Sequence, residues 1–89
     1  MSLIDEARVK INEIDQKMIE LFKQRIVAVM DVLKYKKEHN LAVFDEKREI
    51  ELIKKNLNIL NDKELEKYYL TFFQGVLESS KDYQRDHYE

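Results

Sequence analysis

Apolar residues recur along the first part of the chain at alternating intervals of three and four residues. They stand at Ile4, Ala7, Ile11, Ile14, Met18, Leu21, Ala28, Val32 and Tyr35, and only Arg25 interrupts the alternation. This spacing places them on one stripe of an α-helix, as in helices that pair with other helices. The pattern predicts one helix over residues 3–39, which at about 1.5 Å per residue is on the order of 55 Å long.

Two shorter amphipathic stretches follow the long helix. Residues 39–44 break the heptad pattern, and Asp45 offers an N-cap side chain before the apolar positions from Ile50 to Leu57. Asparagines between residues 56 and 61 interrupt the next stretch, and Asp62 can cap a third helix with apolar and aromatic positions from Leu65 to Leu77. We therefore expect further helices at residues 45–57 and 62–86.

The chain has no proline and a single glycine, so the expected fold class is all-α, with a long, a short and a medium helix in one domain over residues 1–89. A compact domain of this length has a radius of gyration of about 12 Å. The residues that follow the long helix are too few to cover its apolar stripe. A second copy of the chain must bury much of that stripe, which predicts an intertwined helical-bundle homodimer.

Composition limits how such a small domain can be stabilised. A core of this size benefits from disulfides, a metal ion or oligomerisation. Cysteine is absent, and His39 and His87 lie far apart without the spacing of zinc ligands. We expect no metal site, which leaves oligomerisation as the reinforcement and agrees with the predicted homodimer.

Charge and hydropathy exclude two classes of partner. The 16 basic and 18 acidic side chains give a net charge of −2, unlike the strongly basic surface of a nucleic-acid-binding protein. No apolar run approaches the ~20 residues of a membrane span, and the N-terminus lacks the pattern of a signal peptide. We expect a cytoplasmic protein that binds neither nucleic acid nor a membrane.

Two cations in the long helix are candidates for binding an anion. Arg25 occupies a stripe position where an aliphatic residue is expected, and a buried guanidinium needs an anionic partner. Lys36 lies eleven residues later, which returns to within about 20° of the same face, and Val29 and Val32 stand between the two. Arg25 could instead form an interhelical salt bridge with Glu20 or Glu49, and Lys36 could be a solvated lysine at a helix end.

Arg8 stands seventeen residues before Arg25, about 25 Å away along the helix axis. That separation is too large for both to bind one small molecule within a single chain. In an antiparallel dimer Arg8 can enter the site of the partner. The alternative is a surface arginine that pairs with Asp5 or Asn12.

The second and third helices carry further polar candidates. Asp45, Arg48 and Glu49 lie at the first turn of the second helix, where side chains and free backbone N–H groups can bind a hydroxyl or carboxylate group. Ser80 and Gln84 are four residues apart and therefore point the same way from the third helix. Capping, surface ion pairs and solvation are the alternatives at these positions.

The order and spacing of these residues resemble those of the AroQ-type, all-helical chorismate mutases over essentially the whole chain. The resemblance rests on Arg8, Arg25, Lys36, Asp45-x-x-Arg48-Glu49 and Ser80-x-x-x-Gln84, and on three local strings. These strings are Ile11-Asn-Glu-Ile-Asp15, Leu21-Phe-Lys-Gln-Arg25 and Val43-Phe-Asp-Glu-Lys-Arg-Glu49. The loop before Asp45 departs from the family in lacking a proline. The length is that of a monofunctional enzyme, although a domain cut from a longer polypeptide would look the same.

The resemblance implies an isomerase that converts chorismate to prephenate in phenylalanine and tyrosine biosynthesis, without a cofactor. This pericyclic rearrangement needs neither a nucleophile nor a proton transfer. Arg25 and the partner's Arg8 would bind the two substrate carboxylates. Lys36 and Gln84 would donate hydrogen bonds to the ether oxygen, and Glu49, with the backbone near Asp45, would accept one from the ring hydroxyl. Arg48 and Ser80 would complete the polar lining.

Three other functions compete with this one. Helical relatives of these mutases eliminate pyruvate from isochorismate with a similar cationic pocket, and the identity of the product separates the two reactions. A non-catalytic dimerisation module would explain the heptads but leave Arg25 as an unexplained energetic cost. A nucleic-acid-binding helical bundle is disfavoured by the acidic balance of charge.

Overall fold

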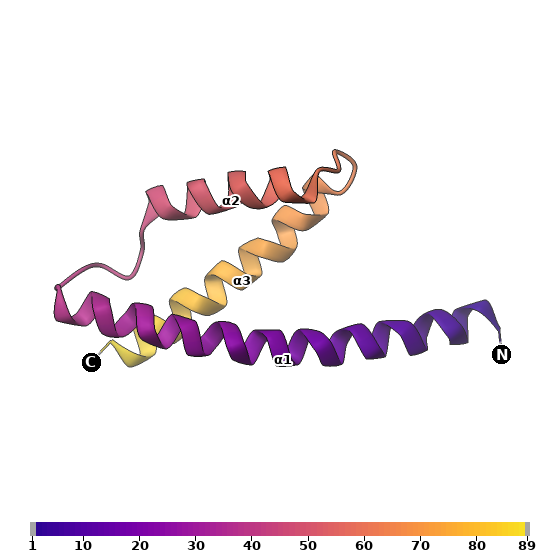
Figure 1. Ribbon diagram of the computed structural model, residues 1–89, viewed down its shortest axis with the longest axis horizontal. Helices are drawn as coiled ribbons and strands as arrows, with labels where there is room; N and C mark the ends of the chain where they lie inside the picture. The colour runs from indigo at the N-terminus through magenta and orange to yellow at the C-terminus, as the bar shows by residue number, and fades with distance from the viewer. Residues whose placement is uncertain (1, 89) are drawn as a thin grey trace.

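The computed structural model describes residues 2–88, and this part of the chain forms three α-helices. Helix α1 spans Leu3–Glu38, α2 spans Glu46–Leu60 and α3 spans Glu66–His87. Figure 1 shows that α3 crosses the C-terminal half of α1 and that α2 lies beyond α3 on its other side. The all-α class and the order of long, short and medium helices are confirmed.

Local side chains define both ends of α1. The Ser2 hydroxyl accepts a hydrogen bond from the backbone N–H of Asp5 at 3.3 Å, which caps the first turn. At the other end Asn40 adopts a left-handed backbone conformation with φ of 53°. The N–H of Leu41 then bonds to the carbonyl of Lys36 at 2.8 Å, which closes the last turn and turns the chain toward α2.

Helix α2 begins where the sequence predicts and continues three residues beyond the expected end. Asp45 caps its first turn, with its carboxylate accepting from the N–H of Arg48 at 3.1 Å. Asn56 does not interrupt the helix, because its side-chain amide donates to the Tyr69 hydroxyl of α3 at 3.0 Å. The helix ends at Leu60, and the next residue, Asn61, has a φ of 48°, the left-handed conformation common after helix C-termini.

The prediction that Asp62 caps the third helix is wrong. Its carboxylate accepts hydrogen bonds from the backbone N–H groups of Glu64 and Leu65, at 3.0 and 3.3 Å. These bonds stabilise a separate turn over residues 63–65, and α3 starts only at Glu66. Asp62 therefore caps the turn that leads into the helix and not the helix itself.

The small core lies where α3 packs on α1. Val29 and Leu33 of α1 and Phe73 and Leu77 of α3 are the buried apolar residues, each between 5 and 8% exposed. Helix α2 packs against α3 but contributes no fully buried residue. Helices α1 and α2 do not pack on each other, and polar and apolar side chains from all three helices line a cleft between them.

The N-terminal half of α1 extends away from the other helices (Figure 1), and residues 3–24 are all exposed. Their apolar side chains include Leu3, Ile11, Ile14 and Leu21, with 54 to 82% of their surface exposed. The radius of gyration is 16.3 Å, well above the ~12 Å of a compact domain of this length. No helix in the described residues is long and apolar enough to cross a membrane.

Candidate active site

A polar cleft opens between the C-terminal half of α1, the start of α2 and the C-terminal half of α3. It is lined by seven of the eight residues singled out from the sequence, all except Arg8. These are Arg25, Lys36, Asp45, Arg48, Glu49, Ser80 and Gln84. Apolar residues, among them Val29, Val32, Leu52 and Leu77, form the rest of the lining. Side chains that are up to 59 residues apart in sequence thus meet around one space.

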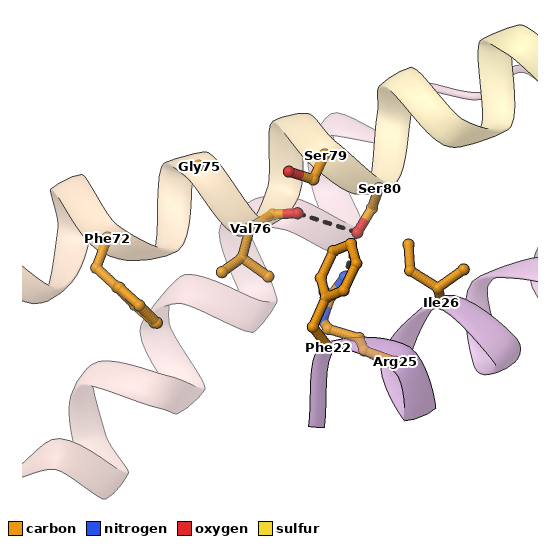
Figure 2. A pocket seen from close by; sticks show the side chains of 8 residues that line it. All are labelled: Phe22, Arg25, Ile26, Phe72, Gly75, Val76, Ser79 and Ser80. Carbon is orange, nitrogen blue, oxygen red and sulfur yellow. Dashed lines mark hydrogen bonds between the residues drawn. The ribbon is translucent and has the colours of Figure 1, made fainter. Parts of the chain in front are cut away.

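Arg25 reaches from α1 to α3 at one end of the cleft. It donates to the Ser80 hydroxyl, which in turn donates to the carbonyl of Val76 at 3.0 Å (Figure 2). Burial lowers the pKa of Arg25 from its ordinary value, and the nearby charge of Arg48 acts in the same direction, although Tyr69 opposes it. An arginine stays protonated under these conditions, so a positive charge with incomplete hydration faces the cleft.

The alternative of an interhelical salt bridge at Arg25 is wrong. Glu20 pairs with Lys23 at 3.9 Å on the outside of α1. Glu49 pairs instead with Lys81 of α3, at 3.3 Å. Among residues 2–88 no carboxylate oxygen lies within 4.0 Å of a nitrogen of Arg25.

Lys36 stands at the opposite end of the cleft and is half-buried. Its Nζ donates to the Val43 carbonyl at 2.6 Å and to the Gln84 Oε1 atom at 3.0 Å. Burial lowers the pKa of Lys36, whereas the charges of Asp45 and Glu49 raise it. The alternative of a solvated lysine at the helix end is therefore wrong, because the ammonium group bonds to the loop between α1 and α2 and to α3.

Gln84 is one of two buried polar side chains among the described residues, with 6% of its surface exposed. Its amide nitrogen donates to the Ser80 carbonyl at 3.2 Å, and its amide oxygen accepts from Lys36. The second N–H of the amide is not used by either contact. Lys36, with three N–H donors and two bonds, likewise keeps one donor for a ligand.

The first turn of α2 supplies Asp45, Arg48 and Glu49, but their environments differ. Asp45 and Arg48 are exposed at the mouth of the cleft, while Glu49 is half-buried. Because the Arg48 N–H bonds to the Asp45 side chain, that backbone donor is occupied by capping. The Glu49 N–H bonds to the Asp45 carbonyl at 3.0 Å, so side chains rather than these backbone groups face a ligand here.

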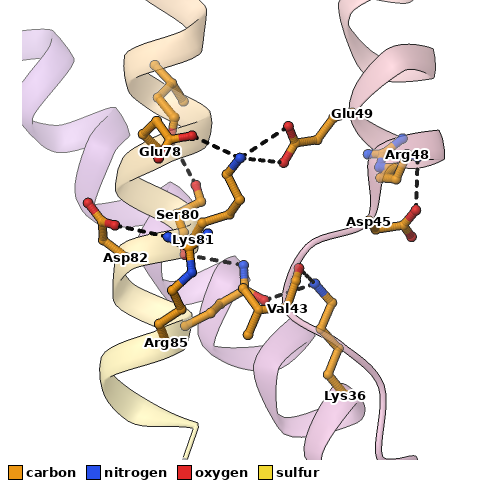
Figure 3. Close-up of polar contacts among 12 residues, drawn as sticks. Lys36, Val43, Asp45, Arg48, Glu49, Glu78, Ser80, Lys81, Asp82 and Arg85 are labelled. Carbon is orange, nitrogen blue, oxygen red and sulfur yellow. Dashed lines mark hydrogen bonds and ion pairs between the residues drawn. The ribbon is translucent and has the colours of Figure 1, made fainter.

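Lys81 lines the same cleft and is absent from the set derived from the sequence. Its ammonium group contacts both Glu49 and Glu78 (Figure 3), and only 12% of its side chain is exposed. The i, i+3 spacing of Glu78 and Lys81 is visible in the sequence, but such pairs are common on solvated helix faces. The contact with Glu49 joins residues 32 apart, and only the packing of α2 on α3 reveals it.

Arg8 lies far from this group, on the uncovered half of α1. It is exposed, and within the described residues no hydrogen bond or ion pair joins it to Asp5 or Asn12. At about 1.5 Å per residue the seventeen residues to Arg25 correspond to about 25 Å. One copy of the chain does not bring Arg8 to the cleft.

A second, mainly apolar recess adjoins the cleft on the other side of the contact between Arg25 and Ser80. Figure 2 shows its lining residues on α1 and α3. Phe22 and Phe72 stand at its edges, and each exposes more than half of its surface. The recess has a volume of about 300 Å³, whereas the polar cleft encloses about 160 Å³. The cleft is smaller than the ~300 Å³ typical of small-molecule sites, and it is open to solvent in one copy of the chain.

The chemistry that the cleft can perform follows from its side chains. It offers fixed cations and amide donors for a ligand with several negative oxygens, and a carboxylate that can accept a hydrogen bond. Within residues 2–88 no group of three or more His, Asp or Glu side chains is arranged to hold a metal ion. The arrangement suits binding, orientation and stabilisation of developing negative charge.

Comparison with protein families places the chain in a known family. The family model described as chorismate mutase type II matches residues 7–85, which include all eight residues singled out from the sequence. No match was found among curated proteins, and none among solved structures. Because the match covers nearly the whole chain, the protein belongs to the chorismate mutase type II family, whose members rearrange chorismate to prephenate.

Proposed function

We propose that the cleft between the three helices binds chorismate and that the side chains around it catalyse its rearrangement to prephenate. One observation carries the assignment of the site. Arg25 and Lys36 are half-buried cations at the two ends of the cleft, and neither has a carboxylate within 4.0 Å among residues 2–88. Unpaired charges removed from water are costly, and a dicarboxylate substrate supplies the missing anions.

Arg25 binds one substrate carboxylate in this proposal. Its guanidinium is planar and presents parallel N–H donors that match the two oxygens of a carboxylate. The contact with Ser80, itself only 7% exposed, fixes the guanidinium against α3. Arg48, exposed at the mouth of the cleft, adds positive charge along the path by which the anion enters.

Lys36 and Gln84 donate hydrogen bonds to the ether oxygen of chorismate. Their contact at 3.0 Å supports this role, because two groups so close can reach the same substrate atom. Negative charge grows on the ether oxygen as its bond to the ring breaks, and donors already in place stabilise it without reorganisation. Glu49, from the first turn of α2, accepts the hydrogen bond of the ring hydroxyl.

No residue of the cleft needs to gain or lose a proton in this reaction. The enzyme holds the substrate in its compact reactive conformation and stabilises the charge separation of the transition state. Asp45 contributes by capping α2, which places Glu49 and Arg48 at the cleft. These roles explain why a catalytic site contains cations and amides instead of a nucleophile with an adjacent base.

A second copy of the chain completes the site by contributing Arg8. The uncovered apolar stripe on the N-terminal half of α1 supports this, because burying such a surface drives helix pairing. The open side of the cleft and the adjoining apolar recess also lie on surfaces that one copy leaves uncovered. An antiparallel arrangement brings the Arg8 end of one α1 toward the Arg25 region of the other, and Arg8 then binds the second carboxylate.

The activity is tested by adding the purified protein to chorismate and identifying the product by chromatography. Prephenate is the expected product. Unchanged chorismate would refute the assignment. Pyruvate released from isochorismate, with chorismate left unchanged, would identify the related lyase reaction instead.

The shared site is tested with two inactive variants. Arg8→Ala and Lys36→Ala each damage every site of their own homodimer. When the two are unfolded and refolded together, a mixed dimer contains one site with both residues intact. We expect a fraction of the activity to return. If tagged heterodimers can be isolated and remain inactive, Arg8 does not act in the partner's site.

A further inference from the structure

Lys81 occupies a position in the cleft wall that the reaction does not by itself explain. Its Nζ lies 3.3 Å from Oε2 and 3.4 Å from Oε1 of Glu49, so it contacts both carboxylate oxygens. It also lies 2.9 Å from Oε1 of Glu78 on its own helix and 4.8 Å from the centre of the Phe44 ring. Contacts from α2, α3 and the loop between α1 and α2 therefore fix this ammonium group.

The other ion pairs among the described residues are of a different kind. Lys23 with Glu20 and Lys63 with Glu66 are i, i+3 pairs whose lysine side chains are 68 and 96% exposed. Such exposed pairs contribute little to stability, and these two do not hold a side chain at the cleft. The Lys81 side chain is 12% exposed and that of Glu49 22%, and their contact joins two helices. The partly covered setting reduces screening by water and makes the pair stronger.

Three other cations besides Lys81 lie around the cleft near Glu49. Arg25, Lys36 and Arg48 line the same cleft, and the Glu49 charge already influences the Lys36 ammonium group. A carboxylate free to move would approach these cations and neutralise them. Each such contact would occupy a group that the proposed reaction needs for the substrate. The contact with Lys81 instead places Glu49 against α3.

We propose that Lys81 is a positioning residue that anchors Glu49 and thereby keeps Arg25 and Lys36 available for the substrate. This inference rests on the proposed function, in which those two cations bind chorismate. Lys81 itself does not touch the reacting atoms. Its two carboxylate partners balance its charge, so it adds a fixed anchor to the cleft without adding a competing site for the substrate.

The test is Lys81→Met, which keeps the length and apolar stem of the side chain and removes the charge. A released Glu49 competes with the substrate in the ground state, and such a change raises KM more than it lowers kcat. We expect KM to rise about tenfold and kcat to change less than about threefold. Lys81→Arg, which retains a cation, should recover most of the loss.

The Glu49→Gln background separates positioning from a general structural role. Without its charge Glu49 has no reason to move onto the cations, so adding Lys81→Met to Glu49→Gln should change KM less than twofold. A coupling of this kind is what a double-mutant cycle measures. The double variant removes both charges of the Lys81–Glu49 pair and so leaves neither of them without its partner, which makes it the comparison if Lys81→Met alone fails to fold.

Two controls remove other ion pairs. Glu78→Gln leaves the contact between Lys81 and Glu49 in place, and Lys63→Met removes an exposed pair far from the cleft. Both should keep the KM of the unmodified protein. The inference is overturned if Lys81→Met leaves KM unchanged, or if it raises KM equally with and without Glu49→Gln. Failure of the proposed function is distinct, because the unmodified chain would then show no turnover of chorismate.

Discussion

Replacing Lys36 with alanine tests the proposed chemistry most directly. The Lys36 ammonium group uses two of its three N–H donors on Val43 and Gln84, and the third is available for the ether oxygen. Losing one preorganised donor at a site of developing charge costs about 3 to 4 kcal/mol of transition-state stabilisation. We therefore expect kcat to fall at least about a hundredfold.

The same substitution has a separate and smaller effect on stability. It leaves the Gln84 amide oxygen, which is buried, without its partner, and an unsatisfied buried acceptor costs about 1–3 kcal/mol. Against this, Lys36 is half-buried and loses part of its solvation on folding, and removing it relieves that cost. The variant should therefore remain helical and folded while its turnover is lost.

The assay follows the disappearance of chorismate at saturating substrate, with circular dichroism to verify the fold. Lys37→Ala is the matched control, because Lys37 lies in the same last turn of α1 but is exposed and does not line the cleft. It should retain normal turnover. Near-normal kcat in a folded Lys36→Ala variant would refute the role of Lys36 at the ether oxygen.

Two further predictions concern pH and backbone stability. Activity should be flat from about pH 6 to 8, because no cleft residue transfers a proton; a sharp change across neutral pH would contradict the mechanism. At alkaline pH, kcat/KM should fall as Lys36 loses its proton, with a midpoint below the ordinary lysine value of 10.5, since burial lowers its pKa. A midpoint at or above 10.5 would be inconsistent with that burial. Gly75→Ala should raise the free energy of unfolding by about 0.5–1 kcal/mol in urea titrations, because Gly75 is helical and an added Cβ would meet nothing within 4 Å. Destabilisation would mean that another surface packs closely against this position.

The sequence predicted those parts of the fold that depend on local periodicity. The heptad stripe of α1 and the cap at Asp45 are encoded within a few residues, and both predicted positions agree with the helices observed. Asp62 and Asn56 were misinterpreted because the same residue types serve as helix caps, turn formers and partners across an interface. Asn56 continues α2 since Tyr69 satisfies its amide, and that contact depends on the tertiary packing.

The candidate site was predictable for a different reason. Arg25 stands out because it breaks an apolar stripe, and Lys36 because the helical period returns it to the same face. Lys81 could not be distinguished in this way, because its i, i+3 partner Glu78 offers an ordinary surface pair. The interhelical contact with Glu49 arises only when α2 folds against α3, and no local pattern contains it.

The unpaired cations of the cleft have a consequence for the evolution of the protein. Arg25 and Lys36 are kept partly dehydrated without carboxylates from the described residues, an energetic cost that an apolar residue at either position would avoid. The sequence therefore trades stability for readiness to bind an anion. A search for heat-resistant variants should find substitutions at these two positions, and those variants should be the ones that lose activity.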